Sequence, residues 1–234
     1  MFALNKCLVK SCRNIAVSTF DENGNITNED NYCLDHIPDP GKAQQEIYSY
    51  IKNHDKIIGL NTAGMTFTGI DLTNKRFYGC NFMHCTFTNL HSEGFISRMS
   101  IFDFAVFTGC TLLKCNMKFS SFAGCTFSHT LFTGSDMVQN NFNGIKSLQS
   151  SFDDSDLYNS RFIRAKLINT SIRNCNIKNA MFIELEHENL SFKKSNTNAA
   201  IFDEKGSTLF KGETKSFDGD IKIESGGDSL KSTV

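Results

Sequence analysis

The chain has 234 residues, enough for one large domain with a sizeable core. Its 24 basic and 25 acidic side chains leave a net charge of −1, which gives no global attraction for nucleic acid, acidic membranes or polycationic partners. No apolar run could form a signal-peptide core or reach the roughly 20 residues of a membrane-spanning helix. We therefore expect a cytoplasmic protein with no membrane segment, whose nine cysteines are reduced unless they hold metal.

Residues 1–39 contain a candidate metal site made of Cys7, Cys12, Cys33 and His36. Their spacing is C-x4-C-x20-C-x2-H, and the two pairs are separated by "FDENGNITNEDN", a segment typical of a hairpin turn. Three thiolates and one imidazole suit tetrahedral Zn²⁺. A segment of this size cannot build a sufficient core of its own, so metal would stabilise it. The sequence thus predicts a zinc-knuckle-like module.

Two other interpretations of these residues stay open. They are ordinary buried thiols with a surface histidine, or a redox pair of cysteines. If a metal is bound, the protein fills all four positions, which favours a structural site over a catalytic one that keeps a place for water.

Residues 40–64 predict a capping helix and a lead-in to the next region. Asp39 and Pro40 have the arrangement of an N-cap and first turn, and "GKAQQEIYSYIKNH" places Ile47, Tyr50, Ile51 and His54 on one face of a helix over 41–54. Coiling is expected to begin in "KIIGLNTAGMTF".

A five-residue period organises residues 65–202. Every fifth position from Phe67 to Phe202 gives 28 central positions, of which 15 are Phe, four Leu, two Ile and two Met. A second series, two residues earlier, is mostly small and contains every cysteine beyond residue 40. This period matches neither a helix nor a simple strand. The chain must therefore turn at fixed intervals and bury its side chains inward, which is a solenoid.

The stretches "FAGCTF", "SSFDDSDLYNSRF" and "RAKLINTSIRNCNIKNAMF" resemble pentapeptide-repeat proteins, over about 140 residues of the chain. That resemblance implies an all-β fold, a right-handed quadrilateral parallel β-helix with four pentapeptides in each coil. The 28 central positions then make seven coils, stacked at about 4.8 Å into a rod roughly 30–35 Å long. Proline would remove backbone donors from such a rod, which explains its absence there.

Five central positions break the series: Ser92, Ser97, Ser147, His187 and Thr197. Before four of them a large residue replaces the small one, namely Leu90, Phe95, Ile145 and Leu185. The conserved volume favours continuous coiling. The alternative is a projecting loop at "LHSEGFISRMS", residues 90–100, which would be a candidate functional loop.

Residues 203–234 form a polar tail whose last ten or so residues we expect to be disordered. Coils of 20 residues would bring Ile163, Met181, Ile183 and Ile201 onto one outer face. An exposed apolar cluster of this kind is a candidate interface, to be covered by the folded-back tail or by a second copy of the chain in a homodimer.

No catalytic residues are predicted. The histidines at 84, 91, 129 and 187 are scattered over different coils, and "DDSD" at 153–156 is typical of a solvated turn. We expect a non-enzymatic, bacterial scaffold that binds an unidentified protein. One alternative is a modulator of DNA gyrase or topoisomerase that mimics DNA, which the resemblance suggests but the 10 acidic and 13 basic residues of 65–202 disfavour. Another is a zinc-dependent enzyme. The basic cluster of Arg161, Arg164 and Lys166 is more typical of a solvated surface than of a nucleic-acid binding site.

Overall fold

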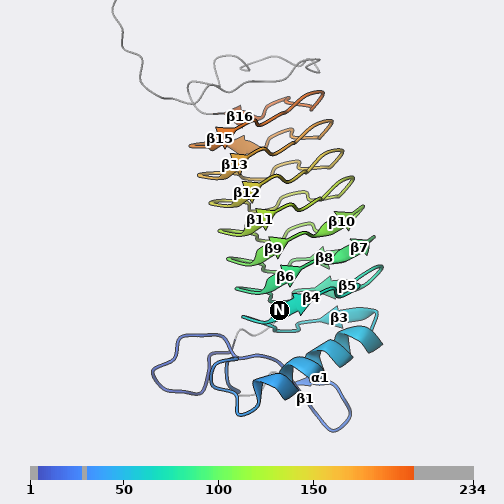
Figure 1. Ribbon diagram of the computed structural model, residues 1–234, viewed down its shortest axis with the longest axis vertical. Coiled ribbons are helices and arrows are strands. Elements are labelled where there is room, and N and C mark those ends of the chain that lie inside the picture. Colours follow the sequence, from blue (N-terminus) through green and yellow to red (C-terminus); the bar gives the residue numbers. More distant parts are fainter. Residues whose placement is uncertain (1–4, 28–30, 203–234) are drawn as a thin grey trace, which may run out of the picture.

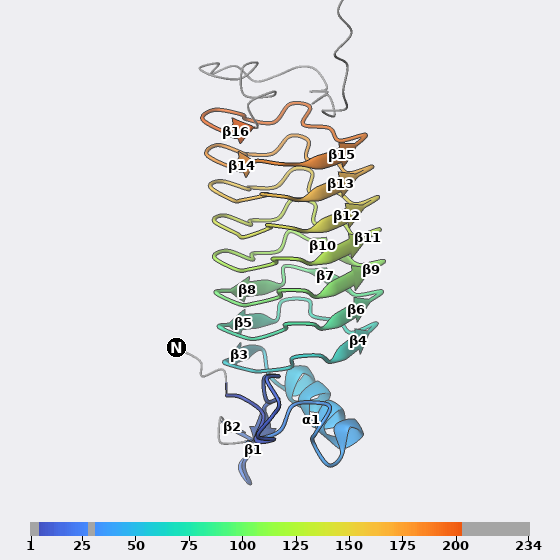
Figure 2. The ribbon, with the colours of Figure 1, turned by 90° about the vertical axis from the view of Figure 1, so that its left-hand side faces the viewer.

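The computed structural model describes residues 5–27 and 31–202. They form a tall stack of coils that stands on an N-terminal module and one helix, as Figure 1 and Figure 2 show from two sides. The tail at 203–234, with its expected disorder, lies outside the described residues. Within the described part of the chain, no helix has the length and apolar character needed to cross a membrane.

The coils repeat every 20 residues. Parallel pairing joins Lys56 to Arg76, Thr66 to Thr86 and so on up to Met181 with Ile201, always at the same spacing. Twenty residues hold four pentapeptides, so the 28 central positions make seven coils. The fold is a parallel β-solenoid, which confirms the fold class expected from the five-residue period.

Each coil is built from very short strands joined by tight turns. The largest sheet stacks seven strands in the order β15, β13, β12, β11, β9, β6, β4. The strands are β1 (Thr19–Phe20), β2 (Ile26–Thr27), β3 (Lys56–Ile58), β4 (Thr66–Thr68), β5 (Arg76–Tyr78), β6 (Thr86–Thr88), β7 (His91–Glu93), β8 (Ile96–Arg98), β9 (Val106–Thr108), β10 (Thr111–Leu113), β11 (Thr126–Ser128), β12 (Lys146–Leu148), β13 (Lys166–Ile168), β14 (Met181–Phe182), β15 (Glu186–Glu188) and β16 (Ile201–Phe202).

Phenylalanine rings fill the core of the solenoid. Seven of them form one unbroken stack in which successive ring centroids lie 4.7–5.3 Å apart. They are Phe82, Phe102, Phe122, Phe142, Phe162, Phe182 and Phe202. Stacked rings add about 0.5–1.5 kcal/mol per pair to the free energy of area burial. A residue that recurs at the coil spacing can stack on itself, which explains why phenylalanine occupies so many central positions.

The small inward residues donate hydrogen bonds to backbone carbonyl groups of the preceding coil. The Sγ of Cys125 donates to the carbonyl oxygen of Phe102 at 2.9 Å, and the Oγ of Ser120 donates to that of Ser97 at 3.1 Å, both 23 residues back. Cysteine and serine thus perform the same role. We call the six cysteines of this series the slot cysteines: Cys80, Cys85, Cys110, Cys115, Cys125 and Cys175, all buried and free. Burial raises the pKa of Cys80, Cys85, Cys115 and Cys175 to about 12.

Residues 90–100 continue the solenoid, so the alternative of a projecting loop is wrong. β7 and β8 occupy this segment and pair with the neighbouring coils. Leu90 and Phe95 are 1% and 3% exposed, and they fill the space left by the buried Ser92 and Ser97. The exchange of volume between two neighbouring inward positions therefore preserves the core.

The predicted helix is present as α1 (Pro40–Asn53), and it covers the first coil. The side chain of Asp39 accepts a hydrogen bond from the backbone N–H of Lys42 at 2.9 Å, the arrangement of an N-cap. Ile47 and Ile51 are buried as expected. His54 is the C-cap residue, one position beyond the end of α1; it is exposed, and its ring stacks on Tyr50 with centroids 4.0 Å apart.

Candidate metal centre

Two loops of the N-terminal module bring the four predicted ligands together. Cys7 and Cys12 flank a turn in which the backbone N–H of Cys12 donates to the carbonyl of Val9, and the antiparallel bridge between Lys6 and Ile15 closes it. The second loop is a turn in which the backbone N–H of His36 donates to the carbonyl of Cys33 at 3.0 Å. Between the loops, β1 and β2 form the predicted hairpin. The spacing in sequence thus becomes proximity in space.

The ligand atoms of Cys7, Cys12, Cys33 and His36 all lie within 4.8 Å of one another. Cys7 Sγ is 3.5 Å from His36 Nδ1, and Cys33 Sγ is 3.3 Å from the same nitrogen. The sulfurs of Cys12 and Cys33 are 3.8 Å apart, far beyond the length of about 2.05 Å for a disulfide bond. The redox-pair interpretation therefore has no covalent bond to support it here.

These separations fit a tetrahedral ion. With Zn–S bonds of about 2.3 Å and a Zn–N bond of about 2.05 Å, tetrahedral geometry places two sulfurs about 3.8 Å apart and sulfur and nitrogen about 3.6 Å apart. The observed 3.8, 3.5 and 3.3 Å agree within 0.3 Å. Two of the thiols, those of Cys7 and Cys33, are buried, whereas His36 is exposed. The cluster can hold a metal ion at the edge of the module.

Local hydrogen bonds favour the thiolate form of Cys7. Burial by itself raises the pKa of the Cys7 thiol, but hydrogen bonds from the backbone of Cys33 and Val9 and from the His36 ring lower it to about 6. Burial raises the pKa of Cys33 above its usual value, with a further contribution from the neighbouring Cys7 and Cys12. Crowded thiols of this kind ionise together only when a cation offsets their mutual repulsion.

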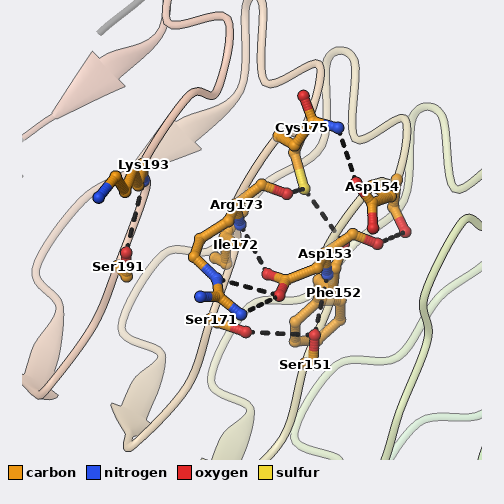
Figure 3. Close-up of polar contacts among 12 residues, drawn as sticks. Ser151, Phe152, Asp153, Asp154, Ser171, Ile172, Arg173, Cys175, Ser191 and Lys193 are labelled. Carbon is orange, nitrogen blue, oxygen red and sulfur yellow. Dashed lines mark hydrogen bonds and ion pairs between the residues drawn. The ribbon is translucent and has the colours of Figure 1, made fainter. Parts of the chain in front are cut away.

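The other sequence-predicted residues do not form a second centre. Asp153 accepts two hydrogen bonds from the Arg173 guanidinium, at 3.1 and 2.8 Å, and Asp154 accepts one from Asn174 at 2.7 Å (Figure 3). The "DDSD" carboxylates are thus engaged in a ladder between coils, as a turn rather than a metal site. In the same view, Cys175 points to the inner side and donates to the Phe152 carbonyl at 3.1 Å.

The predicted interface residues lie on one face of the last coils. Met181 pairs with Ile201 in register, and the carbonyls of Met181 and Ile183 accept hydrogen bonds from Phe162 and Arg164 of the coil before. Ile201 is 48% exposed. Ile163, Met181 and Ile183 are half-buried.

Sequence reasoning missed a cavity of about 380 Å³ between the module and the first coils. Arg13 and Leu34 line it from the module, and Met83 and His84 line it from the solenoid. No local signal marks these residues, because they meet only when the module packs against the coils.

Comparison with known proteins agrees with this architecture. The model of the family "Pentapeptide repeats" matches residues 100–139 and 149–184 in eight copies. A solenoid of five-residue repeats defines the class, and the matched residues of the solenoid are pentapeptide repeats. No curated protein matches the chain.

Solved structures with similar folds share little sequence with the chain. Trypsin-treated QnrB1, described as a plasmid-mediated fluoroquinolone resistance protein, is 13% identical, with 67% of this chain and 95% of that chain covered and a TM-score of 0.39. Rfr23, a pentapeptide repeat protein from the cyanobacterium Cyanothece 51142, is 13% identical, with coverages of 57% and 91% and a TM-score of 0.29. A pentapeptide repeat protein from the Arabidopsis thaliana thylakoid lumen is 24% identical, with coverages of 41% and 59% and a TM-score of 0.22. These values are too low to carry an argument about function.

Proposed function

We propose that the protein is a non-catalytic scaffold whose solenoid binds another protein. The observation that carries this proposal is a group of large apolar side chains on the outer corners of neighbouring coils. Met99, Phe104 and Phe119 are 57%, 55% and 52% exposed. We call these three residues the corner patch. Clustered apolar groups on a soluble protein mark interaction surfaces more often than scattered ones do.

The solenoid holds the corner patch rigidly. Met99 and Phe104 occupy the two corners that bound one face of a coil, and Phe119 occupies the Met99 corner of the next coil. All three have positive φ angles, of 52°, 61° and 58°, so their side chains leave the coil in the same outward manner. A rigid apolar patch loses little conformational entropy on binding, which favours affinity.

The described residues offer no comparable catalytic arrangement. His84 and His129 lie at different corners, His91 is exposed in β7, and His187 is half-buried in β15. The adjacent carboxylates of Asp153 and Asp154 accept hydrogen bonds from Arg173 and Asn174. Support for a binding role over an enzymatic one rests on this contrast.

Replacing both rings by asparagine tests the scaffold proposal. Asparagine already occupies equivalent positive-φ corners at Asn74, Asn89 and Asn159, so Phe104→Asn with Phe119→Asn should fold normally. The matched control is Gln139→Asn with Gln149→Asn, at corners with φ of 55° and 49°. The partner protein is first identified by affinity capture and then purified. We expect its affinity for the phenylalanine variant to be at least about tenfold lower than for the wild type, and its affinity for the control variant to be unchanged. Equal binding by both variants would remove the corner patch from the proposal.

We further propose that Cys7, Cys12, Cys33 and His36 bind one structural Zn²⁺. The distances fit tetrahedral coordination, and three thiolates with one imidazole favour zinc over harder cations. Bound zinc would act as a crosslink between the two loops of the module. With four protein ligands, the site leaves no position for substrate, which argues against the alternative of a zinc-dependent enzyme.

Elemental analysis of the purified protein tests the metal. We expect about one equivalent of zinc for the wild type, and less than half an equivalent for Cys33→Ser. The matched control is Cys125→Ser, a slot cysteine whose variant keeps the hydroxyl donor found at Ser120. Full zinc in Cys33→Ser, or less than half an equivalent in the wild type, would contradict the assignment.

The alternative of a gyrase or topoisomerase modulator that imitates DNA has less support. Its mechanism needs a strongly negative rod, whereas three ion pairs across neighbouring coils, Arg164 with Glu184, Lys166 with Glu186 and Arg173 with Asp153, interleave both signs. We expect no inhibition of gyrase supercoiling by the purified protein. Inhibition at a stoichiometric ratio would favour the alternative.

For the apolar C-terminal face, we propose a second copy of the chain as the occupant. Ile163, Met181, Ile183 and Ile201 adjoin the last coil, whose strands β15 and β16 have no following coil among the described residues. Unpaired strand edges favour association. Light scattering of the full chain should give a dimer, and Ile201→Asp should give a monomer. A dimer only after removal of residues 203–234 would instead favour the tail as the cover.

A further inference from the structure

The cavity between the module and the first coils has the composition of a binding site that the scaffold function leaves unassigned. Its volume of about 380 Å³ lies within the range of about 300–1,000 Å³ of small binding pockets. The walls combine apolar groups, Leu34 and Met83, with the polar groups of Arg13, Asp35 and His84. The cavity therefore suits a group that is partly apolar and partly charged.

One wall of the cavity is the ring of His84, which a second aromatic ring holds in place. His84 stacks on Phe104 of the next coil, with ring centroids 5.3 Å apart and planes inclined by 10°. Gly124, in the coil after that, leaves room for the Phe104 ring, because a Cβ there would come within 2.6 Å of it. The column of corner positions thus holds Gly64, His84, Phe104 and Gly124, with two stacked rings between two glycines.

Gly64 leaves space in this column on the side of the cavity. A Cβ at Gly64 would meet only Leu34 Cδ2, at 3.9 Å. Phe104 covers one face of the His84 ring, whereas the His84 residue is exposed and lines the cavity together with Gly64. A planar ring entering the cavity can extend the column by stacking on His84, with Met83 beside it as a polarisable sulfur contact.

Of the residues that line the cavity, Arg13 carries a positive charge and Asp35 a negative one. The Asp35 carboxylate accepts a hydrogen bond from Asn14 Nδ2 at 3.0 Å, which satisfies part of its hydrogen-bonding capacity. Arg13 is exposed, and no ion pair with it is found among residues 5–27 and 31–202. A free guanidinium at the rim favours a carboxylate, which it can bind through two N–H groups.

We propose that this cavity binds an aromatic side chain with an adjacent carboxylate residue, presented by an extended segment of the partner protein. The inference rests on the proposed scaffold function and specifies the chemistry of its partner. A protein segment fits better than a free small molecule because the apolar surface continues beyond the cavity. Phe104 is both the support of His84 and a member of the corner patch, so a segment anchored in the cavity can run on over Met99 and Phe119.

The test uses the full-length protein with ¹³C-labelled methionine methyl groups and short peptides blocked at both ends. The probe is a peptide containing tyrosine followed by glutamate. Matched peptides replace the tyrosine by leucine or the glutamate by glutamine. The methyl signal of Met83 reports on the cavity, that of Met181 at the other end of the solenoid is an internal control, and those of the buried Met117 and Met137 report on the fold.

We expect the tyrosine–glutamate peptide to shift the Met83 signal through its ring current and to leave the Met181 signal unchanged. Loss of the ring should weaken binding by about 2- to 10-fold, the value of a stacked pair. Loss of the carboxylate should weaken binding by up to about fivefold, the value of an exposed ion pair. An unshifted Met83 signal, or equal binding of all three peptides, would overturn the proposal.

Two variants assign these preferences to residues. His84→Gly should abolish the preference for tyrosine over leucine, and His129→Gly, also an exposed histidine at a positive-φ corner, should not. Arg13→Gln should abolish the preference for glutamate over glutamine, and Lys10→Gln on the same loop should not. Preferences that survive in His84→Gly or Arg13→Gln would contradict the assignment.

Two further outcomes separate this inference from the scaffold proposal. If phenylacetate binds as tightly as the peptide, a free small molecule is the better occupant and the partner segment is wrong. If a purified partner binds through the corner patch but binds His84→Gly and Arg13→Gln as tightly as the wild type, the scaffold function stands and the cavity inference fails.

Discussion

Gly124→Ala tests whether the rings on the outer corners are held in the way the structure shows. Gly124 has a φ of +66°, and an added Cβ would lie 2.6 Å from Phe104 Cδ1. Gly144 has almost the same backbone, with a φ of +67°, but an added Cβ there would meet only the Gly124 nitrogen at 4.0 Å. The pair thus separates the cost of the left-handed backbone from the cost of the ring contact.

The expected magnitudes follow from these contacts. Gly144→Ala should lower the free energy of unfolding by about 1–2 kcal/mol, the cost of a left-handed conformation for a residue with a Cβ. In Gly124→Ala the Phe104 ring must also rotate away and leave His84. Because Phe104 is 55% exposed, the ring can move outward. The extra cost is therefore about the value of one ring pair, 0.5–1.5 kcal/mol.

Urea unfolding followed by circular dichroism measures both variants, alone and in a Phe104→Gly background. Phe104 has a φ of 61°, which glycine accepts without strain. Without the ring, Gly124→Ala and Gly144→Ala should destabilise the protein equally. The reasoning is refuted if Gly124→Ala costs no more than Gly144→Ala in the wild type, or if its excess cost persists after Phe104 is removed.

Three further predictions concern the interior. Burial lowers the pKa of His187 below its usual value, so the unfolded chain binds more protons and stability should fall as pH drops below about 6.5; His187→Leu should remove this pH dependence in thermal unfolding. Asn140 accepts a hydrogen bond from the Ser120 N–H at 2.8 Å, but its buried Nδ2 has no partner; Asn140→Ser should raise the free energy of unfolding by about 1 kcal/mol, and Asn140→Ala should not. The slot cysteines with a pKa of about 12 should not react with a thiol reagent at pH 8 until the protein unfolds, and rapid labelling of the native protein would contradict their role as filler.

The repeating part of the fold could be predicted from sequence in detail, because buried positions in a solenoid recur at a fixed spacing along the chain. A side chain turns inward at every fifth residue, so Phe82, Phe102 and Phe122 mark the core before any contact is known. Even the exceptions were predictable: Phe95 beside Ser97 preserves the volume of the layer, and both are buried. The same arithmetic separates the slot cysteines from Cys7, Cys12 and Cys33.

The candidate metal cluster was predictable for a different reason. Its four residues fall in two pairs that are close in sequence, and the hairpin between the pairs brings them together in space. The exposed position of His54 was not predictable, because the helical pattern cannot say where the helix ends and the chain departs.

By itself, the sequence determined the coil, the core and the cluster of three cysteines and one histidine, since each depends on spacing along the chain. Only the tertiary structure decided how the module sits on the solenoid. Arg13, Leu34 and His84 come from separate segments and have no common pattern, yet the docking of the module encloses a cavity between them. Packing between units with independent local patterns leaves no periodic trace, which is why the cavity appears only in three dimensions.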